Sequence, residues 1–468
     1  MMIKRWWGAA FSDDVFRRLL RNVTYLFSAH VLVAVIGLLT LAVLARALGP
    51  AGLGVIALIE AYIRTVDRIF RFEPWQAVVR YGAIALENGR EDDFRRLTKF
   101  ATLFDLFGAS LGALAALGAA KYAASWLGLD DDQTRMAMWF SATLAFSLSS
   151  TPTAILRLFD KFGLIAKMSA GLACTRLFLM VLVWQLGGGL WSFVIVLMLY
   201  QIAEQLTPLA LAWRELRRQG YVGVWRTPLR GLLAENPGLP RFVWNSNINV
   251  MARTSTNRFD TLILGALLDP AAVGLYQLAK RTGLAALRLG RPIQQAVYPD
   301  VARLWARGEV ARFRSIVLRV NGVMGALGAV AFVVIVPSVD ILVRLAFGSE
   351  FAAAAPLIIV QVLAVMLFLA GNTFNPALLS IGADRSLIRV TLTATIVFFA
   401  AFVPFVHQFG LVGASLSHVA FNFTWLVGCL SVFLYRTRPA IPAMANPGKP
   451  CGEDQVDETP PPGRGDGP

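Results

Sequence analysis

Long apolar runs separated by short polar segments dominate this sequence. A helix needs about twenty apolar residues to cross the hydrocarbon core of a bilayer. Such runs lie near 24–44, 100–120, 137–156, 165–186, 190–212, 316–336, 354–374, 387–407 and 411–434. Three further segments have the length but carry charged side chains: 53–72, 242–267 and 272–296. The pattern predicts an all-α integral membrane protein whose span number depends on whether these three also cross.

The distribution of Lys and Arg indicates that they do. If all twelve segments cross and the N-terminus is cytoplasmic, the cytoplasmic loops and termini hold 29 basic residues. The outer loops hold only Arg46, Lys121, Arg135 and Arg344. Removing any charged segment would disrupt this separation, which is the one that the positive-inside rule requires. We therefore predict twelve transmembrane helices with both termini in the cytoplasm.

Composition excludes several other classes of protein. Of the 468 residues, 56% are hydrophobic and 16% are charged, whereas a soluble domain has about 25% charged residues. The net charge of +15 would suggest a nucleic-acid partner in a soluble protein, but here it mostly fixes orientation. Three cysteines and three histidines are too few for a disulfide scaffold or a histidine metal centre, and we interpret His30 and His418 as packing residues. Because nucleotide-binding, metalloprotease and thiol-redox motifs are lacking, we predict no enzyme activity, catalytic residue, metal, cofactor or nucleic-acid partner.

A short internal repeat relates the two halves of the chain. A shift of 220 residues superposes Pro50 on Pro270, Gly54 on Gly274, Arg68 on Arg288 and Arg71 on Arg291. Halves with an even number of spans run parallel, so we predict two parallel six-helix halves around a central cavity. The predicted organisation is a cytoplasmic amphipathic segment at 1–22, an N-lobe at 23–212, a basic cytoplasmic linker at 213–241, a C-lobe at 242–435 and a disordered cytoplasmic tail at 436–468.

Charged side chains at membrane depth mark a candidate binding site. Eleven basic and five acidic residues lie within the predicted spans, and each would cost about 2.5–3.5 kcal/mol at the centre of a helix facing lipid. Most of them follow one stripe on each of the second, seventh and eighth helices, so we expect these stripes to line a wet cavity between the halves. The candidate residues for an anionic or sugar ligand are Arg64, Arg68, Arg71, Asn249, Arg253, Asn257, Lys280, Arg281, Arg288 and Arg291.

The carboxylates at the same depth have several interpretations. We predict that they position the basic groups or couple ions: Glu60, Asp67, Asp105, Glu204 and Asp260. A salt-bridge ladder along the second helix is an alternative for the pairs Glu60–Arg64 and Asp67–Arg71, which are four residues apart. Interhelical hydrogen bonds are the alternative for Asp105 and Glu204.

Several motifs resemble those of a known family. They are Arg46-Ala-Leu-Gly-Pro-Ala-Gly-Leu-Gly54, Asp260-Thr-Leu-Ile-Leu-Gly265, Val273-Gly-Leu-Tyr-Gln-Leu-Ala279, Tyr298-Pro-Asp300 and Phe347-Gly-Ser-Glu-Phe351. Over about 22–435 the chain resembles polysaccharide exporters of the multidrug/oligosaccharidyl-lipid/polysaccharide (MOP) superfamily, and within it the Wzx-like lipid-linked oligosaccharide flippases. The resemblance implies a MATE/MOP-like fold with a cationic central cavity.

The resemblance also implies a function and partners. The expected activity is the alternating-access transfer of a polyprenyl-diphosphate-linked oligosaccharide across the bacterial cytoplasmic (inner) membrane, for O-antigen or exopolysaccharide assembly. Besides membrane lipids, the polysaccharide polymerase and chain-length machinery are candidate partners. The alternatives are a flippase for a lipid II-type peptidoglycan precursor, a MATE-like small-molecule exporter and a membrane-embedded glycan polymerase or ligase. A basic cavity disfavours cationic drugs, and short outer loops disfavour the enzyme.

Overall fold

The computed structural model describes residues 14–71, 74–232, 238–239, 243 and 256–438, and within these ranges the chain is helical and contains no β-strand. Eight helical stretches in them are long and apolar enough to cross a membrane. The prediction of an all-α integral membrane fold is therefore confirmed, while the count of twelve spans stays a prediction. One counted stretch, Val31–Phe70, contains most of two predicted spans.

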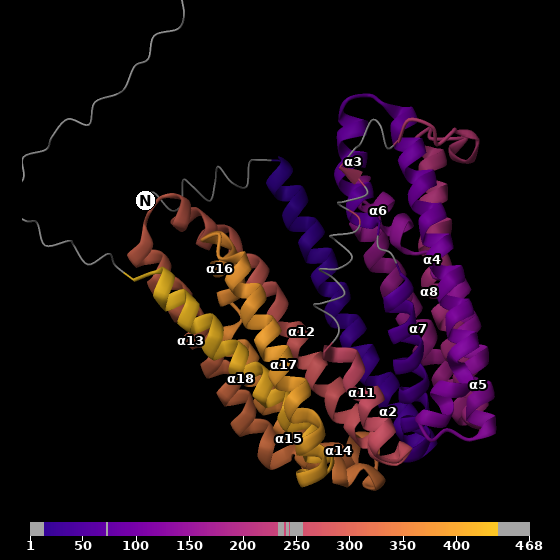
Figure 1. The fold of residues 1–468 in the computed structure, drawn as a ribbon, viewed down its shortest axis with the longest axis vertical. Coiled ribbons are helices and arrows are strands. Elements are labelled where there is room, and N and C mark those ends of the chain that lie inside the picture. The colour runs from indigo at the N-terminus through magenta and orange to yellow at the C-terminus, as the bar shows by residue number, and fades with distance from the viewer. Residues whose placement is uncertain (1–13, 72–73, 233–237, 240–242, 244–255, 439–468) are drawn as a thin grey trace, which may run out of the picture.

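The helices form two groups, which Figure 1 shows side by side. The N-lobe consists of α2 (Asp14–Phe70), α3 (Trp75–Glu87), α4 (Glu91–Trp126), α5 (Asp131–Ala142), η1 (Thr143–Phe146), α6 (Ser150–Leu158), α7 (Phe162–Gln185) and α8 (Leu190–Arg218), followed by η2 (Val224–Arg226). The C-lobe consists of α11 (Thr256–Leu267), α12 (Pro270–Ala306), α13 (Val310–Ile335), η3 (Val336–Ser338), α14 (Val339–Phe347), η4 (Ser349–Ala354), α15 (Ala355–Gly371), α16 (Phe374–Ser380), α17 (Asp384–Phe409) and α18 (Leu411–Arg436).

The helix α2 is interrupted by a sharp turn. Gly49 has φ 64° and ψ −175°, a conformation outside the helical region that glycine adopts without the steric penalty of a Cβ atom. Pro50 follows and has no N–H for the helical ladder. This kink lies between the predicted spans 24–44 and 53–72.

The predicted repeat lies where the two lobes meet. A Cβ atom on Gly54 would lie 1.6 Å from the carbonyl oxygen of Pro270, and one on Gly274 would lie 2.0 Å from that of Pro50. Each copy of the motif therefore packs its glycine against the proline carbonyl of the other copy. Only glycine permits such a close approach of two backbones, which explains why both copies of the motif contain Gly at this position.

The lobes are joined at one end and diverge toward the other. In Figure 1 they lie together near α11, α14 and the lower part of α2 and separate toward α3 and α16. One apolar cluster runs through both lobes and includes Leu53 of α2 and Tyr276 of α12. Separate clusters lie in the N-lobe around Phe94 and in the C-lobe around Phe313. The packing core is thus shared at the joined end and divided at the diverging end.

One predicted span is not a continuous helix. Residues 137–156 are divided among α5, η1 and α6, and residues 147–149 lie outside these helices. The interruption comes just before the N-terminus of α6, where the side chain of Asp105 accepts a hydrogen bond of 2.8 Å from the backbone N–H of Thr151. A carboxylate is favourable at a helix N-terminus. The hydroxyl residues and proline of Ser147-Leu-Ser-Ser-Thr-Pro152 mark the break in the sequence, but a search for apolar length alone passes over them.

Candidate functional site

A cavity of about 500 Å³ lies between the lobes and is lined by α2, α7 and α8 on one side and by α11 and α12 on the other. Its apolar lining comes from α2 and α12. Its polar lining consists of Glu60, Arg64, Arg176, Tyr200, Glu204, Thr261, Gln277, Lys280 and Arg281. Five of these residues were predicted site residues, so the sequence stripes on α2 and α12 do converge on one cavity.

Glu60 of α2 binds two of the cavity arginines. Its Oε2 lies 2.6 Å from Nη2 of Arg281 on α12 and 3.5 Å from Nη2 of Arg64 one turn further along α2. The side chain of Glu60 is 11% exposed, whereas that of Arg281 is 30% exposed and that of Arg64 is 57% exposed. The pair with Arg281 connects the two lobes directly, and its cation faces the open space of the cavity.

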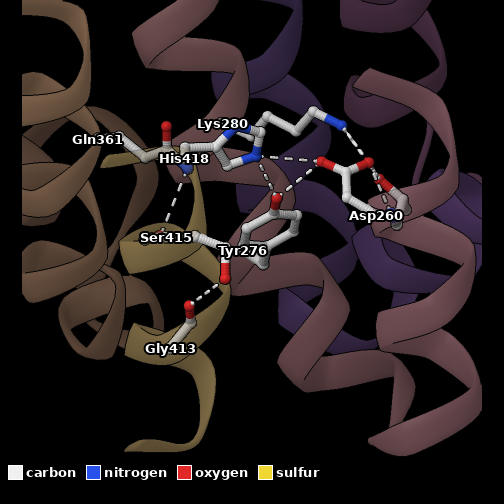
Figure 2. A network of polar contacts seen from close by, with 9 residues as sticks. Asp260, Tyr276, Lys280, Gln361, Gly413, Ser415 and His418 are labelled. Atoms are coloured by element: carbon white, nitrogen blue, oxygen red, sulfur yellow. Dashed lines mark hydrogen bonds and ion pairs between the residues drawn. The ribbon is translucent and has the colours of Figure 1, made fainter. Parts of the chain in front are cut away.

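Asp260 of α11 is the centre of a second network, which Figure 2 shows together with the residues around it. Oδ1 lies 2.7 Å from Nζ of Lys280 and accepts a hydrogen bond from the backbone N–H of Thr261. Oδ2 accepts a bond of 2.7 Å from the hydroxyl of Tyr276 and lies 3.2 Å from Nε2 of His418. Asp260 and Lys280 are 0% and 6% exposed, so this ion pair is buried and both carboxylate oxygens are satisfied.

The hydrogen-bond directions around Tyr276 follow from its chemistry. Tyr276 has one hydroxyl hydrogen and a carboxylate only accepts, so the hydroxyl donates to Asp260. It then accepts from Nε2 of His418, which lies 2.8 Å away. His418 was expected to be a packing residue; it instead joins α18 to α11 and α12 through this polar network. Because His418 is an isolated polar residue in an apolar span, the sequence alone does not indicate which residues it contacts.

Arg176 and Tyr200 form the N-lobe wall of the cavity. The guanidinium carbon of Arg176 on α7 lies 4.5 Å from the ring centroid of Tyr200 on α8, a distance typical of a cation–π contact. Glu204 lies one turn beyond Tyr200 and also lines the cavity. Sequence reasoning counted Arg176 among the arginines at membrane depth but left it out of the site, because it belongs to no charged stripe.

Several predicted site residues lie elsewhere in the N-lobe. Asp67 pairs with Arg71 at 3.0 Å, and both contact the hydroxyl of Ser147. These residues, with Arg68 and Asp105, are absent from the cavity lining that the described residues provide. The charged stripe on α2 is therefore divided: one part faces the cavity, and the pair Asp67–Arg71 lies within the N-lobe as the salt-bridge alternative predicts.

The remaining predicted residues cannot be placed by their side chains. Asn249 and Arg253 lie outside the described residues. Asn257 belongs to α11 and Arg288 and Arg291 to α12, but their side chains are also outside the described part. Their assignment to the site stays a prediction.

The described lining has a positive balance and the chemistry of an anion-binding site. It holds the four cations Arg64, Arg176, Lys280 and Arg281 and the two carboxylates Glu60 and Glu204. Guanidinium groups stay charged at any working pH and bind oxyanions through paired N–H donors. Among the described residues, no three His, Cys, Asp or Glu side chains cluster in a way that could hold a metal ion.

Comparisons with known proteins agree with the fold. Residues 19–305 match the family described as polysaccharide biosynthesis protein. The chain is 29% identical over 356 residues to the inner membrane protein YghQ of Escherichia coli (strain K12), covering 76% of this chain and 99% of YghQ. Its structure is similar to the lipid II flippase MurJ in an inward closed conformation, with TM-score 0.63 and 14% identity over 88% of this chain and 90% of MurJ.

A second solved structure extends the similarity. An inward-facing multidrug resistance MATE transporter of the MOP superfamily aligns with TM-score 0.61 and 13% identity, covering 89% of this chain and 93% of the transporter. The predicted resemblance and fold class are confirmed, and the neighbours are transport proteins and not enzymes. The family match covers more than half of the sequence. This chain therefore belongs to the polysaccharide biosynthesis protein family and is a multi-pass membrane protein with the fold of MOP-superfamily transporters.

Proposed function

We propose that this protein is a flippase that transfers a polyprenyl-diphosphate-linked oligosaccharide from the cytoplasmic to the outer leaflet of the inner membrane, for surface polysaccharides such as O-antigen or exopolysaccharide. Membership of a polysaccharide biosynthesis family supports a role in making a surface polysaccharide. The name of YghQ supports the inner membrane, and the similarity to MurJ, named as a flippase for lipid II, supports a lipid-linked substrate.

The cationic lining of the cavity carries this proposal. A diphosphate joining a lipid to a sugar has two negative charges at neutral pH, and arginine matches the geometry of its oxygens. Arg64, Lys280 and Arg281 line the cavity, so they are placed to contact the diphosphate. A neutral sugar or a cationic drug would gain nothing from an excess of basic groups.

The other predicted residues extend the same proposal. Arg288 and Arg291 follow Arg281 by about two and three turns of α12, in the direction of its predicted cytoplasmic end. We assign to them, and to Arg68, Arg71, Asn249, Arg253 and Asn257, contacts with the substrate on its way to or within the cavity. For Asp260 and Glu60, the ion pairs with Lys280 and Arg281 favour the positioning of cations over ion coupling.

Alternating access requires a closure at the outer end of the lobes that can open. Arg46, next to the α2 turn, donates from Nε to the carbonyl oxygen of Ala346 at 3.1 Å and from Nη2 to that of Leu345. These carbonyls lie at the C-terminal end of α14, where a cation is favourable. By the charge distribution of the loops this end faces outward, so substrate would enter the cavity from the cytoplasm.

Deletion of the gene, followed by analysis of lipid-linked sugars, tests the proposal. We expect surface polysaccharide to be lost and a lipid-linked repeat unit to accumulate. Wild type and Arg312→Gln, which changes an exposed arginine paired with Glu309, should restore export, while Arg281→Gln at equal protein level should not. Accumulation of a peptidoglycan precursor would favour the lipid II alternative, and drug sensitivity without any accumulation would favour an exporter. Unchanged polysaccharide would contradict the proposal.

A further inference from the structure

The four cations that line the cavity differ in what already neutralises them. Arg64 and Arg281 share the carboxylate of Glu60, and Lys280 is held by Asp260. Arg176 lines the same cavity and its charge acts on Glu60, but no ion pair joins it to a carboxylate among the described residues. Its contact within the described part is the face of the Tyr200 ring at 4.5 Å.

The ring of Tyr200 holds Arg176 without neutralising it. An aromatic face attracts a guanidinium group and limits its orientations, but it accepts none of the in-plane N–H donors. Nε of Arg176 is buried and has no hydrogen-bond partner among the described residues. A buried donor left in this state is costly, so an anion that reaches the guanidinium edge gains a binding group with little rearrangement.

An anion that binds first at Lys280 or Arg281 competes with the carboxylate that already holds that cation. If the anion displaced Lys280 from Asp260, which is 0% exposed, the carboxylate would be a buried charge without its main partner. Taking Arg281 would separate Glu60 from its cation at 2.6 Å. Loss of one member of a buried pair is strongly unfavourable, whereas binding at Arg176 leaves both pairs intact.

We propose that Arg176, positioned by the ring of Tyr200, is the primary anchor for a phosphate of the substrate, and that the paired cations Arg64, Arg281 and Lys280 are secondary. This assignment rests on the proposed function and adds to it the residue that dominates recognition of the diphosphate. The guanidinium group binds two oxygens of one phosphate through its in-plane donors. The second phosphate then lies nearer Arg64 and Arg281, and it competes with the carboxylate of Glu60 for these two arginines.

Calorimetric titration of the purified full-length protein with two soluble probes tests the assignment. The first probe is geranyl diphospho-N-acetylglucosamine, whose diphosphate keeps two charges across the neutral range. The second is geranyl N-acetylglucosaminide, which has the same lipid and sugar but no phosphate. Arg176→Gln should weaken binding of the first probe by about 30-fold, the scale of a charged hydrogen-bonded contact, and leave the second unchanged. Arg176→Lys keeps the charge without the paired donors and should lie between wild type and Arg176→Gln.

Variants of the ring and of a distant arginine provide the controls. Tyr200→Phe keeps the aromatic face and should weaken binding of the diphosphate probe less than Tyr200→Leu, which should lose about fivefold. Arg312→Gln removes an exposed arginine outside the cavity and should change nothing. Each variant is first compared with wild type by size-exclusion elution and melting temperature. If Arg176→Gln fails to fold, Arg176→Lys takes its place in the comparison with Lys280→Gln and Arg281→Gln.

The outcomes separate this inference from the function on which it rests. Binding of the diphosphate probe by wild type and equally by Arg176→Gln or Arg176→Lys would overturn the anchor and leave the flippase proposal standing. A larger loss in Lys280→Gln or Arg281→Gln than in Arg176→Gln would also overturn it. Failure of wild type to bind the diphosphate probe would overturn the proposed function and the anchor together.

Discussion

Two carboxylates hold cations at the same cavity in different ways. Asp260 is fully buried, and Lys280, Tyr276, His418 and a backbone N–H surround it. Glu60 is slightly exposed and is bound through one oxygen by two arginines that face the cavity. The first arrangement satisfies its charge completely inside one lobe. The second joins the lobes through a contact that an incoming anion can reach.

The repeat relates the two ion pairs through Glu60 and Lys280. The shift of 220 residues that places Gly54 on Gly274 also places Glu60 on Lys280, so the two halves present opposite charges at equivalent positions. Each charge pairs with a group from the C-lobe: Glu60 with Arg281 across the cavity, and Lys280 with Asp260 behind it. We infer that the Asp260 network fixes the C-lobe wall and that the Glu60 pair exchanges partners during transport.

Removing the carboxylate of Asp260 should have the largest effect on stability. Asp260→Ala leaves Lys280 as an unpaired buried charge, and loss of one member of such a pair costs about 3–5 kcal/mol. We expect a clear fall in the melting temperature of the detergent-solubilised protein, measured by intrinsic fluorescence. The double variant Asp260→Asn with Lys280→Met removes both charges and should recover most of the loss. An unchanged melting temperature in Asp260→Ala would show that the network is not structural.

Removing the charge of Glu60 should change binding more than stability. Glu60→Gln leaves Arg64 and Arg281 in a cavity where water can solvate them, so the melting temperature should fall less than in Asp260→Ala. The two arginines no longer have a carboxylate to lose, and the affinity for geranyl diphospho-N-acetylglucosamine should rise about tenfold, or about 1.4 kcal/mol. Calorimetric titration measures this, with Glu309→Gln at an exposed pair as control. Weaker binding would mean that Glu60 positions the arginines and does not compete with the ligand.

The sequence predicts the frame of this molecule better than the details of its site. Apolar runs and loop charges predict the membrane fold, and the repeated Pro and Gly residues predict two related halves, because length, charge and a short sequence repeat are local properties; that the two copies touch is known from the structure. Convergence of Glu60, Arg64, Lys280 and Arg281 on one cavity follows from helical periodicity.

Pairing between helices is a different kind of information. Asp105 was a candidate for ion coupling, yet it caps α6, and Arg176 was left out although it lines the cavity. Which acid meets which base depends on the rotation and register of packed helices, which a single sequence does not encode in any short pattern. Lone charged residues such as Arg176 and His418 are therefore the ones that sequence reasoning places least well.

The smallest expected effect concerns the most exposed member of the Glu60 cluster. Arg64 is 57% exposed and lies 3.5 Å from Glu60, and exposed ion pairs contribute about 0.2–1 kcal/mol. Arg64→Gln should therefore leave the melting temperature nearly unchanged, and Glu60 keeps Arg281 at 2.6 Å. Affinity for the diphosphate probe should fall only about threefold, within the same range. If Arg64→Gln instead weakened binding as much as Arg176→Gln, pairing with a carboxylate would not decide how much each cavity cation contributes to affinity. The contrast between the Glu60 pairs, which an anion can displace, and the buried Asp260–Lys280 pair would then lose its basis.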